Sequence, residues 1–438
     1  MRRSGSKSTL EDEPATAAPV PAYDGEDKPD IADDDAPASA RRWRSAAMML
    51  AVVPIVAGLS HASTAKMPGG REFSEGKWYS VDIVMYSQEH LTGMDDFLSF
   101  VSSASSPSQI LNRVVPILAC LRGPQVALTV LVAYVAADVS NLALKWPLQG
   151  DRPFWMDERL KQFGGNTCEV GFGMPSGHVQ VTVAAYLTVA EAMKSKLLHG
   201  LVLIAVLLTA LSRVHMAAHT PLQVTCGCVA GLATATAVRA SRTAIRQWGS
   251  FRMPNKRRVI YGVLAVVTIS CFIAVENAVL LALDVEIYTS IANAMKACRG
   301  GLHAVVSSAR GIGRDVGALL GGVVGVCCRY SLSPGGGASS RWSWLDLVLA
   351  LFPVEVGLWL STTLESLALG MVNTGGQTPP DLPGGGGTWL GVISTGEGAA
   401  TVCIFLKYFI ILALGVGVAP VLLDRARLVQ GFYVKPSR

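Results

Sequence analysis

Runs of about twenty apolar residues, separated by short polar loops, recur along the chain from about residue 96 to about residue 423. A run of this length can cross the hydrocarbon core of a bilayer as one helix. The chain is 50% hydrophobic and only 16% charged, whereas soluble domains are nearer a quarter charged. A soluble fold would lack the polar surface needed to cover so large an apolar core. The sequence therefore predicts an all-α polytopic membrane protein.

The basic loops indicate how these spans are oriented. Residues 239–258 carry seven arginines and lysines and no acidic residue. A basic run beside apolar spans is typical of a cytosolic loop, and we prefer this interpretation to a nucleic-acid site. The basic stretches at 329–341 and 424–438 then fall on the same side. About nine core spans are expected, at about 97–121, 125–145, 177–195, 199–213, 220–239, 259–283, 312–328, 345–371 and 399–423.

The N-terminal part differs in composition from the spans. Residues 1–44 are rich in Asp, Glu, Pro and Ala, which predicts a disordered tail. Residues 45–63 form a short apolar stretch after three arginines, and they read either as a signal peptide or as a signal anchor. The membrane-embedded domain is expected at 80–430. Cys168 and Cys298 fall in loops on the non-cytosolic side, and whether they pair stays open.

Three short motifs lie at the ends of these spans. Lys145 ends the second span and is followed by Arg152-Pro153, the sequence 175–178 (Pro-Ser-Gly-His) begins the third, and Arg213 ends the fourth, six residues before His219. The order of the spans places all three motifs on one membrane surface, opposite the basic loops. Motifs that meet on one surface can form one site.

The residue types in these motifs suit a phosphate group. Lys145, Arg152 and Arg213 supply fixed positive charge, which phosphoryl transfer needs on the phosphate oxygens. Ser176 and Gly177 open a helix, whose first N–H groups attract an anion. These five residues are the expected phosphate-binding set.

Two histidines can share the chemistry. We expect His219 to attack phosphorus and His178 to protonate the leaving oxygen, with Gln223 orienting the ring of His219. The motifs hold no carboxylate cluster suited to Mg²⁺, so neither a metal nor another cofactor is expected. The remaining histidines are interpreted as ordinary structural or surface residues: His61, His90, His199, His215 and His303.

Together, Lys-x6-Arg-Pro, Pro-Ser-Gly-His and Ser-Arg-x5-His resemble the signature of the type 2 phosphatidic acid phosphatase superfamily. Further details are similar to its glucose-6-phosphatase branch, including Gln223 where lipid phosphatases typically have Asp. The other matching residues are Asp138, Asn141, Lys145-Trp146, Arg152-Pro153-Phe154-Trp155, Lys161-Gln162-Phe163, Thr167-Cys168-Glu169 and Ala217-Ala218-His219.

The resemblance implies hydrolysis of a small sugar phosphate, glucose 6-phosphate, through a phosphohistidine. It also implies a multi-pass protein of the endoplasmic reticulum membrane, with the site in the lumen and a glucose-6-phosphate transporter as its functional partner. No nucleic acid is implied. Two alternatives remain open: a lipid phosphate phosphatase, acting on phosphatidate or a sphingoid phosphate, and a protein without phosphatase activity that transports or only binds its ligand.

Overall fold

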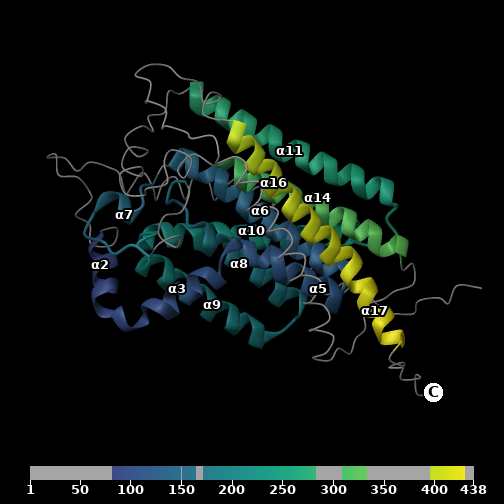
Figure 1. Cartoon of the computed structure of the whole chain (residues 1–438), viewed down its shortest axis with the longest axis horizontal. Coiled ribbons are helices and arrows are strands. Elements are labelled where there is room, and N and C mark those ends of the chain that lie inside the picture. The colour runs from purple at the N-terminus through teal and green to yellow at the C-terminus, as the bar shows by residue number, and fades with distance from the viewer. Residues whose placement is uncertain (1–80, 149, 164–170, 283–307, 333–394, 430–438) are drawn as a thin grey trace, which may run out of the picture.

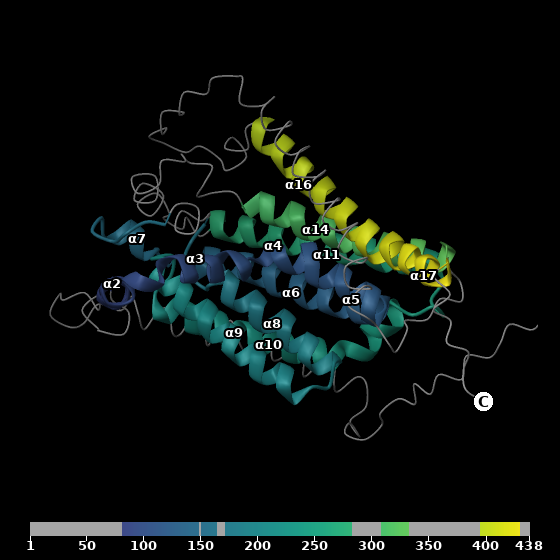
Figure 2. The same cartoon turned by 60° about the horizontal axis from the view of Figure 1, so that its bottom comes forward.

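In the computed structural model, the described residues are 81–148, 150–163, 171–282, 308–332 and 395–429, and all their regular structure is helical. The helices form an elongated bundle (Figures 1 and 2). The expected tail at 1–44, the signal peptide or anchor at 45–63, the span at 345–371 and the cysteine pair lie outside the described residues. The predicted helical class is confirmed, whereas the number of nine spans stays a prediction.

The centre of the bundle is α6 (Pro124–Leu148), which packs against α8 (Gly177–Ala192) and α10 (Pro221–Trp248). The largest cluster of buried apolar side chains surrounds α6. Helix α9 (Lys196–His215) covers the outer side of α8 and exposes a row of leucines, as a lipid-facing helix does. Five described helices are long and apolar enough to cross a membrane: Pro124–Lys145, Lys196–His215, Pro221–Trp248, Gly311–Leu332 and Thr401–Arg425.

The region expected to be a single span at 97–121 is broken into several pieces. After η2 (Thr92–Met94), the pieces are α3 (Asp95–Ala104), α4 (Pro107–Gln109), the π-helical turn η3 (Ile110–Val114) and α5 (Val115–Arg122). The break has a local cause, because Ser106 precedes a proline and is extended, with ψ of 135°. The break leaves α3 as a short helix of its own beside the last part of α9.

A second pair of helices packs on the outside of α6. Helix α14 (Ser308–Leu332) lies along α16 (Thr395–Ala413), which continues through η6 (Leu414–Val418) into α17 (Ala419–Val429) as one long rod (Figure 1). Gly317 and Gly321, one turn apart on α14, lie directly against the backbone of α16, where any side chain would overlap a carbonyl oxygen of α16. The small residues therefore permit the close approach of two helices that is common in membranes.

The two ends of the bundle differ in character. The short helices α2 (Val81–His90) and α7 (Pro153–Met156) lie at one end in both views (Figures 1 and 2). At the other end, α10 gives way to α11 (Asn255–Ala282). Arg258, one of the seven cations of the basic loop, is fully buried there and donates to the carbonyls of Trp248, Ser250 and Met253. This arginine ties the helix ends together, while most of the other cations of the loop are exposed.

Candidate functional site

The end of the bundle that carries α7 is built from four helix termini. Lys145 lies in the last turn of α6, Ser176 is the N-cap of α8, Arg213 lies in the last turn of α9 and Thr220 is the N-cap of α10. Thr220 also forms a capping box with Gln223, which fixes where α10 begins. The expected convergence of the three motifs is therefore seen in the structure.

Arg152 connects two of the motifs. Its side chain is fully buried, and it donates from Nε to the Gly171 carbonyl at 2.9 Å and from Nη1 to the Ala218 carbonyl at 3.1 Å. Lys145 reaches the same place, because its side chain lies against Gly171. Ala218 directly precedes His219, so two expected phosphate ligands and the expected nucleophile are neighbours.

The turn at Ser176 is held from two sides. Its backbone N–H donates to the Gln223 carbonyl at 3.0 Å, and its own carbonyl accepts from the Gln180 N–H in the first turn of α8. The Ser176 hydroxyl oxygen is buried and has no hydrogen-bond partner within the described part of the chain. Gly177 and His178 follow as the first residues of the helix, as the sequence predicted. A buried hydroxyl at a helix N-terminus is a group that an anion could engage.

Two amide side chains from the bundle interior support this turn. Asn141 of α6 donates to the Pro175 carbonyl at 3.1 Å and to Oε1 of Gln180 at 2.9 Å. Gln180 in turn donates to the Ala137 carbonyl. Both amides are buried, so the network is satisfied without water and holds α8 in register with α6.

His219 is almost completely buried, and its orientation is set by backbone groups. Its Nδ1 lies 2.7 Å from the Gly173 carbonyl oxygen. A carbonyl oxygen only accepts, so Nδ1 carries the proton and a neutral ring has its lone pair on Nε2. The backbone N–H of His219 donates to the Arg213 carbonyl at 3.2 Å. The ring is therefore fixed in the tautomer that an attack by Nε2 requires.

The expected direct contact between Gln223 and the ring of His219 is wrong. The Gln223 side chain accepts from the Thr220 N–H at 3.1 Å and donates to the Asp151 carbonyl at 2.6 Å. Both groups of this amide are thus engaged by backbone near the start of α10. Gln223 still lies directly against Gly173, whose carbonyl orients His219. The amide thus packs against the glycine whose carbonyl orients the histidine, an arrangement that the spacing of the motif did not indicate.

Arg213 has a partner that the motifs did not suggest. Its Nη1 donates to the hydroxyl oxygen of Ser102 at 2.6 Å, and both side chains are buried. Ser102 belongs to α3, which the sequence placed inside a transmembrane span. No motif in the sequence marks this serine, because the contact depends on how α3 packs against α9.

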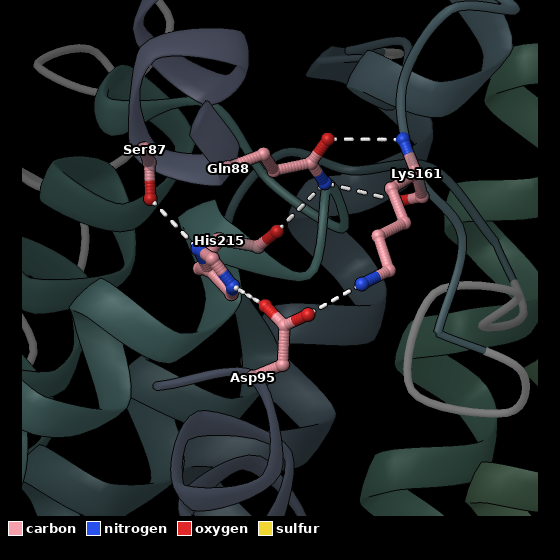
Figure 3. A network of polar contacts seen from close by, with 5 residues as sticks. All are labelled: Ser87, Gln88, Asp95, Lys161 and His215. Atoms are coloured by element: carbon pink, nitrogen blue, oxygen red, sulfur yellow. Dashed lines mark hydrogen bonds and ion pairs between the residues drawn. The ribbon is translucent and has the colours of Figure 1, made fainter. Parts of the chain in front are cut away.

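His215, interpreted from sequence as ordinary, is itself buried and lies at the centre of a polar network (Figure 3). Its Nε2 lies 2.8 Å from the Asp95 carboxylate and its Nδ1 lies 3.1 Å from the Ser87 hydroxyl. Lys161 forms an ion pair with the same carboxylate. The hydrogen bond from Lys161 lowers the pKa of Asp95, and the contact with His215 acts in the same direction against the partial burial of the carboxyl. Asp95 is therefore ionised near neutral pH, and Nε2 of His215 is the donor.

Asp138 is among the residues that carry the resemblance to the family, and its ion-pair partner lies on α14. It forms an ion pair with Arg314 of α14, which also contacts the buried Asp315. This ion pair joins α6 to α14. Asn141, one turn later on α6, contacts the site through Pro175.

Within the described ranges, no group of three or more His, Cys, Asp or Glu side chains is placed to hold a metal ion. The independence from metal that the sequence suggested stays a prediction, because it concerns activity.

The sequence was compared with known protein families. Residues 126–247 match the PAP2 superfamily, and this range contains every site residue expected from the motifs. This segment of the chain is a PAP2 superfamily domain. The resemblance that the three motifs indicated is thereby confirmed.

Similar curated proteins are glucose-6-phosphatases. The chain is 31% identical to glucose-6-phosphatase catalytic subunit 1 of Haplochromis nubilus over 36% of its own length and 53% of that protein. It is 32% identical to glucose-6-phosphatase 3 of Mus musculus, over 33% of this chain and 48% of the mouse protein. It is 27% identical to glucose-6-phosphatase 3 of Rattus norvegicus, over 53% of this chain and 71% of the rat protein.

The match thus spans about half the length of the first two relatives. No solved structure matches the chain significantly.

Proposed function

We propose that this protein is a membrane phosphatase that hydrolyses phosphate monoesters through a phosphohistidine on His219. The observation that carries the proposal is the buried imidazole of His219, whose Nδ1 is held by the Gly173 carbonyl at 2.7 Å. This bond leaves Nε2 as the nitrogen for attack. Arg152 donates to the carbonyl of Ala218, the residue before His219. The carbonyl of Arg213 accepts from the backbone N–H of His219.

The first step forms a bond between Nε2 of His219 and phosphorus and breaks the bond from phosphorus to the ester oxygen. His178 gives its proton to the leaving alkoxide, which departs as an alcohol. Lys145, Arg152 and Arg213, with the Ser176 hydroxyl and the N-terminus of α8, stabilise the charge on the three equatorial oxygens. This is electrostatic catalysis by groups that the fold holds in place.

The second step returns the enzyme to its starting state. His178, now neutral, takes a proton from water, and the resulting nucleophile attacks phosphorus. The bond to Nε2 breaks, inorganic phosphate leaves, and His178 is protonated again. The reaction consumes one water and yields one alcohol and one phosphate. Apart from the ester and water, both proposed steps use only groups of this chain.

The substrate we propose is glucose 6-phosphate. The similar proteins are named glucose-6-phosphatases, and Gln223 stands four residues after His219, as in that branch. The same similarity supports a site facing the lumen of the endoplasmic reticulum. Substrate made in the cytosol would then reach it through a glucose-6-phosphate transporter.

The test is a phosphate-release assay of the purified protein in detergent. Glucose 6-phosphate, mannose 6-phosphate and phosphatidic acid are compared at equal concentrations, with His219→Ala as the control for contaminating phosphatases. We expect the highest kcat/KM with glucose 6-phosphate. A preference for phosphatidic acid would assign the protein to the lipid phosphate phosphatases, and no release from any ester would refute phosphatase activity.

A further inference from the structure

The hydrogen bond between Arg213 and Ser102 joins two parts of the chain that lie 111 residues apart. Ser102 lies outside the range that matches the PAP2 superfamily, whereas Arg213 lies inside it. The arginine has no exposed surface and the serine only 1%. A segment outside the family region therefore supplies a buried partner, at 2.6 Å, to an arginine of the candidate site.

A hydroxyl is a suitable partner for an arginine that must bind an anion. A buried guanidinium has lost its water, so its donors need acceptors inside the protein. A carboxylate in the place of Ser102 would satisfy the donor but would also neutralise the charge and compete with a phosphate. The neutral oxygen of Ser102 fixes the direction of the guanidinium and leaves its positive charge for the ligand.

Ser102 is itself held in place at the end of α9. Asp95 in the first turn of α3 accepts from His215, and Ser87 of α2 contacts the other nitrogen of the same ring (Figure 3). Arg213 and His215 are two residues apart in the last turn of α9. The hairpin formed by α2 and α3 therefore contacts the last turn of α9 at both Arg213 and His215.

Lys161, in the segment that follows Arg152, also contacts this hairpin. It forms an ion pair with Asp95, while its backbone N–H and carbonyl both bond to the side chain of Gln88. Gln88 also donates to the His215 carbonyl at 2.8 Å. These contacts connect α2, α3 and the segment after Arg152 around the last turn of α9.

We propose that Ser102 is a positioning residue of the phosphate site, which aims the guanidinium of Arg213 at the ligand. The α2–α3 hairpin then contributes to phosphate binding by holding Arg213 in position. The inference rests on the proposed function, because it assumes that Arg213 binds a phosphate. The ordinary alternative is that Ser102 only fills space between α3 and α9.

Orthovanadate, which can adopt the five-coordinate geometry of the transferring phosphoryl group, is the probe. Its Kd is measured by titration calorimetry on the purified full chain and on Ser102→Ala. We expect Ser102→Ala to raise the Kd about tenfold, the effect of one lost hydrogen bond to a charged group. Ser103→Ala is the matched control, because Ser103 is the next residue of α3 and its side chain is exposed. It should bind vanadate as the unmodified protein does.

A double-mutant cycle separates positioning from packing. Arg213→Lys cannot keep the geometry of the guanidinium, so Ser102→Ala should cost little more in an Arg213→Lys background. A serine that only fills space would weaken binding by the same factor in both backgrounds. If Ser102→Ala fails to fold, Ser102→Cys, which keeps the size but is a weak acceptor, takes its place in the same cycle.

An unchanged Kd in Ser102→Ala, or equal factors in the two backgrounds, would overturn the inference. The proposed function fails separately. A protein that binds vanadate but releases no phosphate from any ester would refute the hydrolysis, and the cycle would still decide the role of Ser102. A protein that does not bind vanadate at all would refute both.

Discussion

Gly173 holds His219 by one hydrogen bond of 2.7 Å, from Nδ1 of the imidazole to the carbonyl oxygen of the glycine. The glycine is fixed in turn, since its N–H donates to the Gly150 carbonyl at 2.6 Å and its Cα faces the amide of Gln223. A methyl group added at Gly173 would lie 2.6 Å from Oε1 of Gln223. The position of the proposed nucleophile, His219, thus depends on the close packing of the Gly173 backbone against the side-chain amide of Gln223.

The first prediction concerns Gly173→Ala. The new methyl group must push either Gln223 or the 171–174 backbone aside, and the carbonyl that orients His219 moves with it. Because a displacement of about 1 Å can cost about 100-fold in rate, we expect kcat to fall by up to this factor. Steady-state kinetics with p-nitrophenyl phosphate would measure it.

The double variant Gly173→Ala, Gln223→Ala provides the control, since shortening residue 223 removes the steric clash. It should be more active than expected from the product of the two single effects. A Gly173→Ala variant with unchanged kcat would show that this carbonyl does not control the rate.

A second prediction concerns the packing of α14 on α16. Gly317→Ala would place a methyl group on the Phe405 carbonyl, and the helices must separate to accommodate it. We expect destabilisation by about 1–3 kcal/mol, the usual cost of overpacking, seen as a lower Tm in detergent.

The matched control is Gly200→Ala, which lies within α9 and has no atom within 4 Å of the added methyl group. Alanine favours a helix over glycine by up to about 1 kcal/mol, so this variant should be equal to the parent or more stable. Equal losses of Tm in the two variants would contradict the packing argument.

The motifs predicted which side chains gather at the site, because each lies at a helix terminus whose position hydropathy and capping signals reveal. The expected span at 220–239 starts where α10 starts, and Ser176 opens α8 as expected. The order of the spans then brought Lys145, Arg152 and Arg213 to one end. Local signals were sufficient for this part of the fold.

The contacts that orient those side chains could not be predicted in the same way. The acceptor for His219 is a backbone carbonyl, and backbone groups carry no sequence signal. Ser102 contacts Arg213 because α3, which ends at Ala104 shortly before Pro107, packs on α9 as a separate short helix. Arg258 looks like its exposed neighbours in sequence, yet three carbonyls at a helix end enclose it.

A third prediction concerns the sidedness of the membrane. The loop between α10 and α11 is proposed to face the cytosol and α7 the lumen. Phe251→Cys and Met156→Cys place a thiol on exposed residues at the two ends of the bundle. In sealed microsomes, a membrane-impermeant maleimide should label residue 251, and it should label residue 156 only after detergent is added. The unmodified chain corrects for its native cysteines, and the reverse pattern would contradict the orientation.

A fourth prediction concerns metal. Three cations and a helix N-terminus are proposed to neutralise the phosphate, so activity should survive an excess of EDTA and should be inhibited by vanadate. Phosphate release is measured before and after chelation, with and without added Mg²⁺. Loss of activity in EDTA that Mg²⁺ restores would rule out the mechanism.

A fifth prediction separates the two histidines by their leaving groups. His178→Ala removes the proposed acid, so hydrolysis of glucose 6-phosphate should fall by about 100-fold to 10,000-fold. The loss should be smaller with p-nitrophenyl phosphate, whose leaving group needs little protonation. Equal losses with the two esters would show that His178 is not the acid.

The central claim is that a phosphoryl group passes through His219, and covalent trapping tests it most directly. Purified protein is mixed with ³²P-labelled glucose 6-phosphate, quenched within milliseconds in alkali, in which phosphohistidine is stable, and mapped by mass spectrometry. The account predicts label on His219, and none in His219→Ala. Label on His178, or hydrolysis at the normal rate with no labelled histidine, would contradict it.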